Sequence, residues 1–140
     1  MKHLRKFNES SVEDIKSNIE DILSELSDRY IPVDVFLSTV VCQKVCSIQL
    51  GDEYADLDMI RIVPKDNKDE FLRIYDYMES EGYDFSSMSY DSSGVSGDWS
   101  INIVTLRIVD IGLGIDAFSN HLFNGIDETC YLKLFFRKKK

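Results

Sequence analysis

The 140-residue chain has few of the residues that hold covalently cross-linked folds together, with three cysteines, two prolines, seven glycines and two histidines. An odd number of cysteines (Cys42, Cys46 and Cys130) predicts free thiols in a reducing compartment instead of a disulfide framework. No apolar stretch approaches the roughly 18 residues of a membrane span. The first ten residues also lack the apolar run of a signal peptide. These absences predict an intracellular protein that does not engage a membrane.

Charge is unevenly distributed along the chain. The net charge is −9, but residues 1–6 and 137–140 hold 7 of the 16 basic residues and none of the acidic ones, so residues 7–136 carry −16. We therefore predict a basic tail at 1–9, a single domain at 10–136 and a basic tail at 137–140. A body this acidic repels phosphate backbones, so no direct nucleic-acid binding is expected. The expected partner is a protein with a basic surface.

Hydrophobic periodicity predicts two amphipathic helices followed by strands. The first helix spans residues 10–30, and the second begins at Asp66 or Asn67 and ends at Gly82. Their core faces are formed by apolar residues at helical spacing: Ile15, Ile19, Ile22 and Leu26 in the first, and Phe71, Ile74, Tyr75 and Met78 in the second.

The remaining residues are rich in β-branched and aromatic types and predict short strands. The predicted strands span residues 33–42, 45–50, 55–63, 84–90, 99–109 and 130–136, with a turn at Gln43-Lys44, a central place in the sheet for 99–109 and irregular structure at 110–128. The layout occurs twice, since residues 27–30 (Ser-Asp-Arg-Tyr) and 80–83 (Ser-Glu-Gly-Tyr) both connect a helix to strands. We predict an α+β fold with two helices packed on one face of a mostly antiparallel sheet.

Asp56 and Asp58 form the segment most typical of a catalytic metal site. Two aspartates at i and i+2 of a strand point to one side and are able to share a Mg²⁺ ion. The segment resembles the Asp-x-Asp strand of nucleotidyltransferases, although the Gly-Ser pair that precedes it in that family is not found here. The resemblance implies a Mg²⁺-dependent nucleotidyltransferase-like enzyme, and the alternative is a solvent-facing strand end.

Two further groups are candidate sites. Phe118, Leu122 and Phe123 fall in a glycine-flanked segment and would be partner-binding anchors if exposed, or would pack that segment onto the core if buried. A zinc site would require the three cysteines to converge with His121, whereas isolated buried cysteines are the alternative. No cofactor is expected.

The opening residues 1–10 (Met-Lys-His-Leu-Arg-Lys-Phe-Asn-Glu-Ser) resemble the start of many small tailed-bacteriophage proteins. They also resemble the capsid-targeting peptide of internal head proteins in large myoviruses. Residues 22–30 are similar to the helix-to-strand unit of the same phage proteins. The resemblance implies a phage origin and a location in the host cytoplasm or, alternatively, in the virion.

Together these observations favour a small, acidic, non-enzymatic protein that binds a host or viral protein. The alternatives are a virion or capsid-internal structural protein and the Mg²⁺-dependent enzyme. A homodimer through a sheet edge is also open, because an open sheet leaves edge strands to cover.

Overall fold

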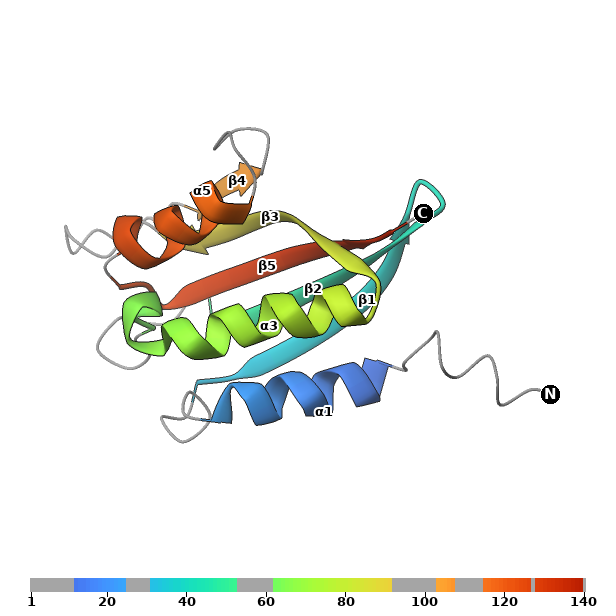
Figure 1. Ribbon diagram of the computed structural model, residues 1–140, viewed down its shortest axis with the longest axis horizontal. Coiled ribbons are helices and arrows are strands. Elements are labelled where there is room, and N and C mark those ends of the chain that lie inside the picture. Colours follow the sequence, from blue (N-terminus) through green and yellow to red (C-terminus); the bar gives the residue numbers. More distant parts are fainter. Residues whose placement is uncertain are drawn as a thin grey trace.

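The computed structural model describes residues 12–24, 31–52, 62–91, 103–107, 115–126 and 128–139. These residues form helices and a five-stranded antiparallel sheet, which confirms the α+β class (Figure 1). The elements in chain order are α1 (Val12–Ile22), β1 (Val33–Val40), β2 (Gln43–Gly51), the 3₁₀ helix η2 (Pro64–Asn67), α3 (Lys68–Ser80), β3 (Tyr83–Asp91), β4 (Ile103–Arg107), α5 (Ile115–Asn120), the π-helical turn η3 (His121–Gly125) and β5 (Tyr131–Lys138).

The last strand of the chain lies at the centre of the sheet. The strand order is β1-β2-β5-β3-β4, and β5 pairs antiparallel with both β2 and β3. The sequence instead predicted a central place for residues 99–109, whose described part is β4 at the edge, paired only with β3. That prediction is wrong because apolar residues on both faces of a strand do not specify which strands flank it.

The helix α3 confirms its predicted core face, since Phe71, Ile74, Tyr75 and Met78 are all buried. The helix ends at Ser80, and Gly82 adopts a φ of +85° just beyond it. A glycine in the left-handed region after a helix is a common C-terminal cap, because it has no Cβ to clash.

The hairpin between β1 and β2 turns at Val41-Cys42 and not at the predicted Gln43-Lys44. Val40 pairs with Gln43, and the two residues between them have positive φ angles of 51° and 61°. This is the geometry of a two-residue type I′ turn, which normally selects asparagine and glycine. The prediction favoured the polar dipeptide Gln43-Lys44, whereas the turn is formed by the apolar pair Val41-Cys42.

Residues from the helices and strands share one core. α1 contacts both β1 and α3, and α3 contacts β3. The centre is occupied by fully buried side chains: Ile15 and Ile19 of α1, Phe71, Ile74 and Met78 of α3, Ile48 and Leu50 of β2, Met88 of β3, and Leu132, Leu134 and Phe136 of β5. None of the helices that the structure describes has the length and apolarity needed to cross a bilayer.

Three further segments differ from the sequence-based prediction or lie outside the described residues. Residues 115–125, predicted as irregular, form α5 and η3. β5 extends to Lys138, so Arg137 and Lys138 pair with β3 and belong to the sheet and not to a tail. Of the predicted strand 55–63, the described part forms a single antiparallel bridge between Ile62 and Thr129. Residues 25–30 are outside the described part of the chain, so the repeated layout stays a prediction.

Candidate binding surface on the β1–β2 hairpin

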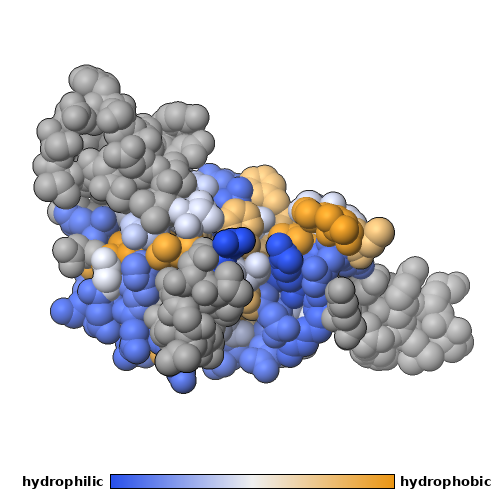
Figure 2. All heavy atoms as spheres, turned by 90° about the horizontal axis from the view of Figure 1, so that it is seen from above, coloured by the Kyte–Doolittle hydropathy of each residue, from blue (hydrophilic) through white to orange (hydrophobic). Residues whose placement is uncertain are grey.

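Exposed large apolar side chains are concentrated on one hairpin. Phe36, Val40 and Val41 are 51%, 52% and 93% exposed, and in the described part of the chain no other large apolar residue is classed as exposed. We call these three residues the hairpin patch. Figure 2 shows apolar surface, in orange, at the end of the molecule toward which the β1–β2 turn projects in Figure 1.

The alternation of a β-strand explains why the patch faces solvent. Val35 and Leu37 point toward the core, where Val35 is buried and Leu37 packs against the core cluster. Phe36 and Val40, an odd number of positions away, therefore lie on the opposite face. On that face the Lys133 ammonium lies 5.9 Å from the Phe36 ring centroid and 5.2 Å from that of Phe135. The contact with Lys133 covers part of the Phe36 ring, and Phe36 remains about half exposed.

Val41, in the turn of the hairpin, is strained in its backbone as well as exposed. Val41 has a φ of 51°, a left-handed conformation that costs a residue with a Cβ roughly 1–2 kcal/mol. Its side chain is 93% exposed, so it gains almost no burial in return. In the isolated chain, therefore, valine at position 41 contributes no packing energy and is not a residue that favours this turn.

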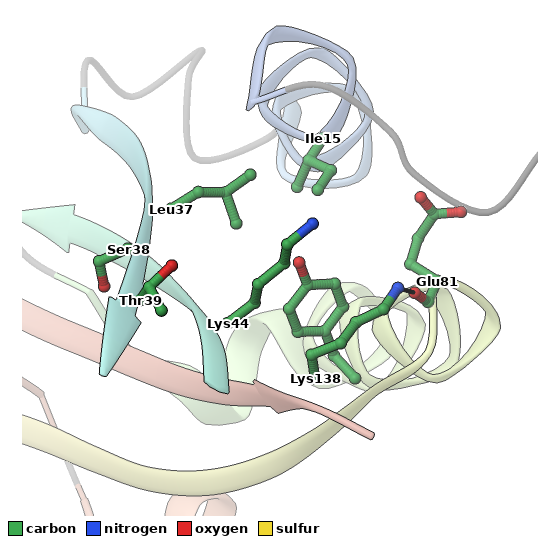
Figure 3. A pocket seen from close by; sticks show the side chains of 8 residues that line it. Ile15, Leu37, Ser38, Thr39, Lys44, Glu81 and Lys138 are labelled. Carbon is green, nitrogen blue, oxygen red and sulfur yellow. Dashed lines mark hydrogen bonds between the residues drawn. The ribbon is translucent and has the colours of Figure 1, made fainter. Parts of the chain in front are cut away.

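A cleft lies on the helix side of the same hairpin, with a volume of about 180 Å³. Its walls come from α1, from β1 and the start of β2, and from the region where α3 leads into β3 and β5 ends (Figure 3). The lining side chains are Ile15, Leu37, Ser38, Thr39, Lys44, Glu81, Tyr83 and Lys138. The set includes apolar, hydroxyl, acidic and basic groups, so the cleft presents a mixed surface.

Lys138 joins the walls of this cleft. Its ammonium donates a hydrogen bond of 2.8 Å to the Glu81 carbonyl and lies 4.9 Å from the centroid of the Tyr83 ring. The Lys138 carbonyl accepts a 2.9 Å bond from the Gln43 side chain at the start of β2. These contacts connect the hairpin to the end of α3. The strands that carry the hairpin patch are therefore held in place by the rest of the domain.

The predicted metal site and the predicted anchors have different outcomes. Asp56 and Asp58 lie outside the described residues, so their role stays a prediction. Leu122 and Phe123 are 0% and 6% exposed, and Phe123 packs against Phe71 with ring centroids 6.3 Å apart. These two side chains pack their segment onto the core and do not form an exposed anchor; the side chain of Phe118 lies outside the described part.

The zinc hypothesis is contradicted. Cys42 is exposed in the hairpin turn, Cys46 is buried in β2, and Cys130 is buried next to the start of β5, at the other end of the β2–β5 ladder. No group of three or more potential metal ligands occurs among the described residues, which include all three cysteines and His121.

We expect the three thiols to react differently. Cys42 is exposed, whereas burial raises the pKa of the Cys46 thiol to about 12 and keeps it protonated. A thiol reagent at mildly alkaline pH should modify one site per folded chain and three after denaturation, and Cys42→Ser should remove the fast reaction. Because the folded-state pKa is raised, the stabilisation from neutral Cys46 is present below the ordinary thiol pKa and is lost as the pH rises toward 12. Equal labelling rates for all three thiols would contradict this assignment.

The hairpin patch was not identified from the sequence, although a signal was present. Consecutive Val40 and Val41 cannot both face the core from one strand, because successive side chains point to opposite faces. Placing the turn two residues late concealed this conflict.

No protein-family model, curated protein or solved structure matches the chain.

Proposed function

We propose that this chain is a small, acidic, non-enzymatic binding protein that contacts another protein through the hairpin patch. The observation that supports the proposal is the concentration of exposed apolar side chains on one hairpin. Apolar residues scattered singly are common on protein surfaces, whereas exposed apolar residues that gather on one element are a feature of interaction sites. Val41 strengthens the argument, because its strained backbone and exposed side chain bring a benefit only when a partner buries it.

The distribution of charge supports a partner with a basic surface. α1 and α3 carry eight acidic and three basic residues, whereas the five strands carry five basic and three acidic. We infer that the two helices cover one face of the sheet, which would concentrate negative charge there and leave the face with Phe36 open. Opposite fields increase the rate of association, and salt reduces this effect.

The origin and location are part of the proposal. The resemblance of residues 1–10 to tailed-phage proteins supports a phage-encoded protein that binds a host or viral target in the host cytoplasm. Purified phage particles provide a test, since a virion location would be supported only if the chain copurifies with them.

The proposal is tested with a variant that separates folding from binding. Val41→Asn places a residue that tolerates positive φ in the turn, and Val40→Thr keeps a β-branched residue in β1. The double variant should unfold at the wild-type denaturant concentration or above it. It should nevertheless lose most partner capture in a nuclease-treated pull-down from host lysate, because its hydrophobic contact surface is reduced.

The matched control is Ser17→Asn, which changes an exposed position on α1. It should capture the same partner as the wild type in the same amount. Equal capture by the double variant and the wild type would show that the hairpin patch is not the contact surface. If the double variant still captures the partner at low salt and loses it at high salt, the attraction that remains in this variant is assigned to charge.

A further inference from the structure

The edge strand β1 lacks the features that normally prevent edge-to-edge pairing. Among the residues that the structure describes, it forms one edge of the sheet, is eight residues long and keeps an uninterrupted register with β2 over its whole length. It contains no proline, glycine, lysine or arginine, and Asp34 is its single charged residue. Natural edge strands are usually short, bulged, charged or interrupted by proline. β1 is therefore a template for another strand.

The hairpin geometry identifies the backbone groups that point outward. In a two-residue hairpin the residues flanking the turn, here Val40 and Gln43, form the hydrogen-bonded type of pair. Because this pairing alternates along the strand, the even-numbered residues of β1 direct their amides toward β2. The amides of Val35, Leu37 and Thr39 consequently point to the free side of the strand.

We propose that β1 pairs antiparallel with β1 of a second copy of this chain, which joins two five-stranded sheets into one. This goes beyond the proposed function, since it concerns the isolated chain. A two-fold axis perpendicular to the sheet passes between the two strands and keeps the open faces of both copies on the same side. The inferred register is centred on Phe36, so that Leu37 lies opposite Val35 of the second copy and Thr39 opposite Val33.

Self-complementarity favours a second copy as the occupant. In this register the half-exposed Phe36 meets its own equivalent, and aromatic cross-strand pairs are among the favourable ones. Asp34 lies opposite Ser38 of the second copy, so no like charges face each other across the new pair. Lys133, already 5.9 Å from the Phe36 ring centroid, would flank the aromatic pair. Val41 lies beyond the paired segment and stays available to a different partner.

Salt should affect this dimer in the opposite sense to a charge-steered complex. α1 packs against β1, so the axis brings the α1 helices of the two copies toward each other on one face of the joined sheet. Each α1 carries Glu13, Asp14, Glu20 and Asp21 against a single Lys16. Screening of this repulsion strengthens a dimer that is held by backbone pairing and apolar contact.

The test is sedimentation velocity on the purified chain over a concentration series at low and high salt. We expect a concentration-dependent species of twice the 16.2 kDa chain mass that increases with salt. Phe36→Lys should weaken dimerisation at least tenfold by placing two lysines opposite each other, and Val41→Lys should leave it unchanged. Thr39→Pro, which removes an outward amide, should also weaken it. A monomer under all conditions, or equal dimerisation by all three variants, would overturn the proposal.

Cross-linking tests the register. In a Cys42→Ser background, Phe36→Cys should form a disulfide-linked dimer on mild oxidation, because position 36 faces itself in the non-hydrogen-bonded geometry. Ser38→Cys in the same background should not, since it would lie opposite Asp34. The reverse result would overturn the register centred on Phe36. All these experiments use the chain alone, so their failure is distinguishable from a failure of partner capture.

Discussion

Phe136→Ala should destabilise the protein by roughly 3–5 kcal/mol, the usual cost of removing a fully buried aromatic side chain. Phe136 is 1% exposed on the central strand β5. Its ring lies 5.6 Å from that of Phe85 and 6.0 Å from that of Tyr75, measured between centroids. The truncation would remove contacts with β3 and α3 at once. A loss of this size is a large share of the 5–15 kcal/mol that stabilises a typical domain.

The neighbouring residue provides the control for this substitution. Phe135 has the same side chain but lies on the other face of β5, half-buried beside Lys133. Phe135→Ala should cost roughly 1–2 kcal/mol, because a half-buried ring loses less transfer free energy. Urea unfolding followed by circular dichroism measures both. Equal losses would contradict the assignment of Phe136 to the core face of β5 and of Phe135 to the opposite face.

Gly51→Ala should be the most damaging single methyl addition in the described part of the chain. Gly51 has a φ of +78°, and a Cβ there would lie 2.1 Å from the Cys130 carbonyl oxygen. The glycine is held in place by its own amide, which donates to the Pro32 carbonyl, and by the next amide, which donates to the Cys130 carbonyl. Because these neighbours are backbone atoms, β2 and the start of β5 would have to separate. We expect a loss of roughly 3–5 kcal/mol, in the range of severe core disruptions.

Gly82→Ala separates the clash from the cost of the backbone conformation. Gly82 has a similar φ of +85°, but the nearest atom to its Cβ would be the Lys138 ammonium at 3.1 Å. A lysine side chain gives way more easily than backbone, so this substitution should cost the left-handed penalty of roughly 1–2 kcal/mol and a smaller amount for the disturbed Lys138 hydrogen bond to the Glu81 carbonyl. Chemical denaturation should therefore give a much lower free energy of unfolding for Gly51→Ala than for Gly82→Ala. An equal effect would show that φ alone determines the cost.

Local sequence patterns predict the elements of this fold better than their arrangement. The second helix was recognised with its core face because Phe71, Ile74, Tyr75 and Met78 follow the 3.6-residue period, and its end because Gly82 is free of the Cβ penalty. The central place of β5 depends on pairing between strands that are distant in the sequence. No local pattern in residues 131–138 specifies which strands flank them.

The candidate surface escaped prediction because it violates the local rules. Turn chemistry favours asparagine, aspartate or glycine at positive φ, whereas this chain has Val41 and Cys42 there. Positions at which local preference conflicts with the observed structure are often functional. The anchors selected from the sequence show the converse, since Leu122 and Phe123 contribute to the core, and the glycines flanking their segment gave no indication of this.

The most direct test of the binding proposal is the dissociation constant of the purified captured partner, measured by calorimetry at several salt concentrations. The hairpin variant Val40→Thr/Val41→Asn should bind at least about tenfold more weakly at every salt concentration, as expected for the loss of about 1.4 kcal/mol of apolar contact. The α1 variant Glu20→Gln/Asp21→Asn, which removes two negative charges, should bind more weakly than the wild type at low salt only. Wild-type affinity in the hairpin variant at all salt concentrations would contradict the proposal.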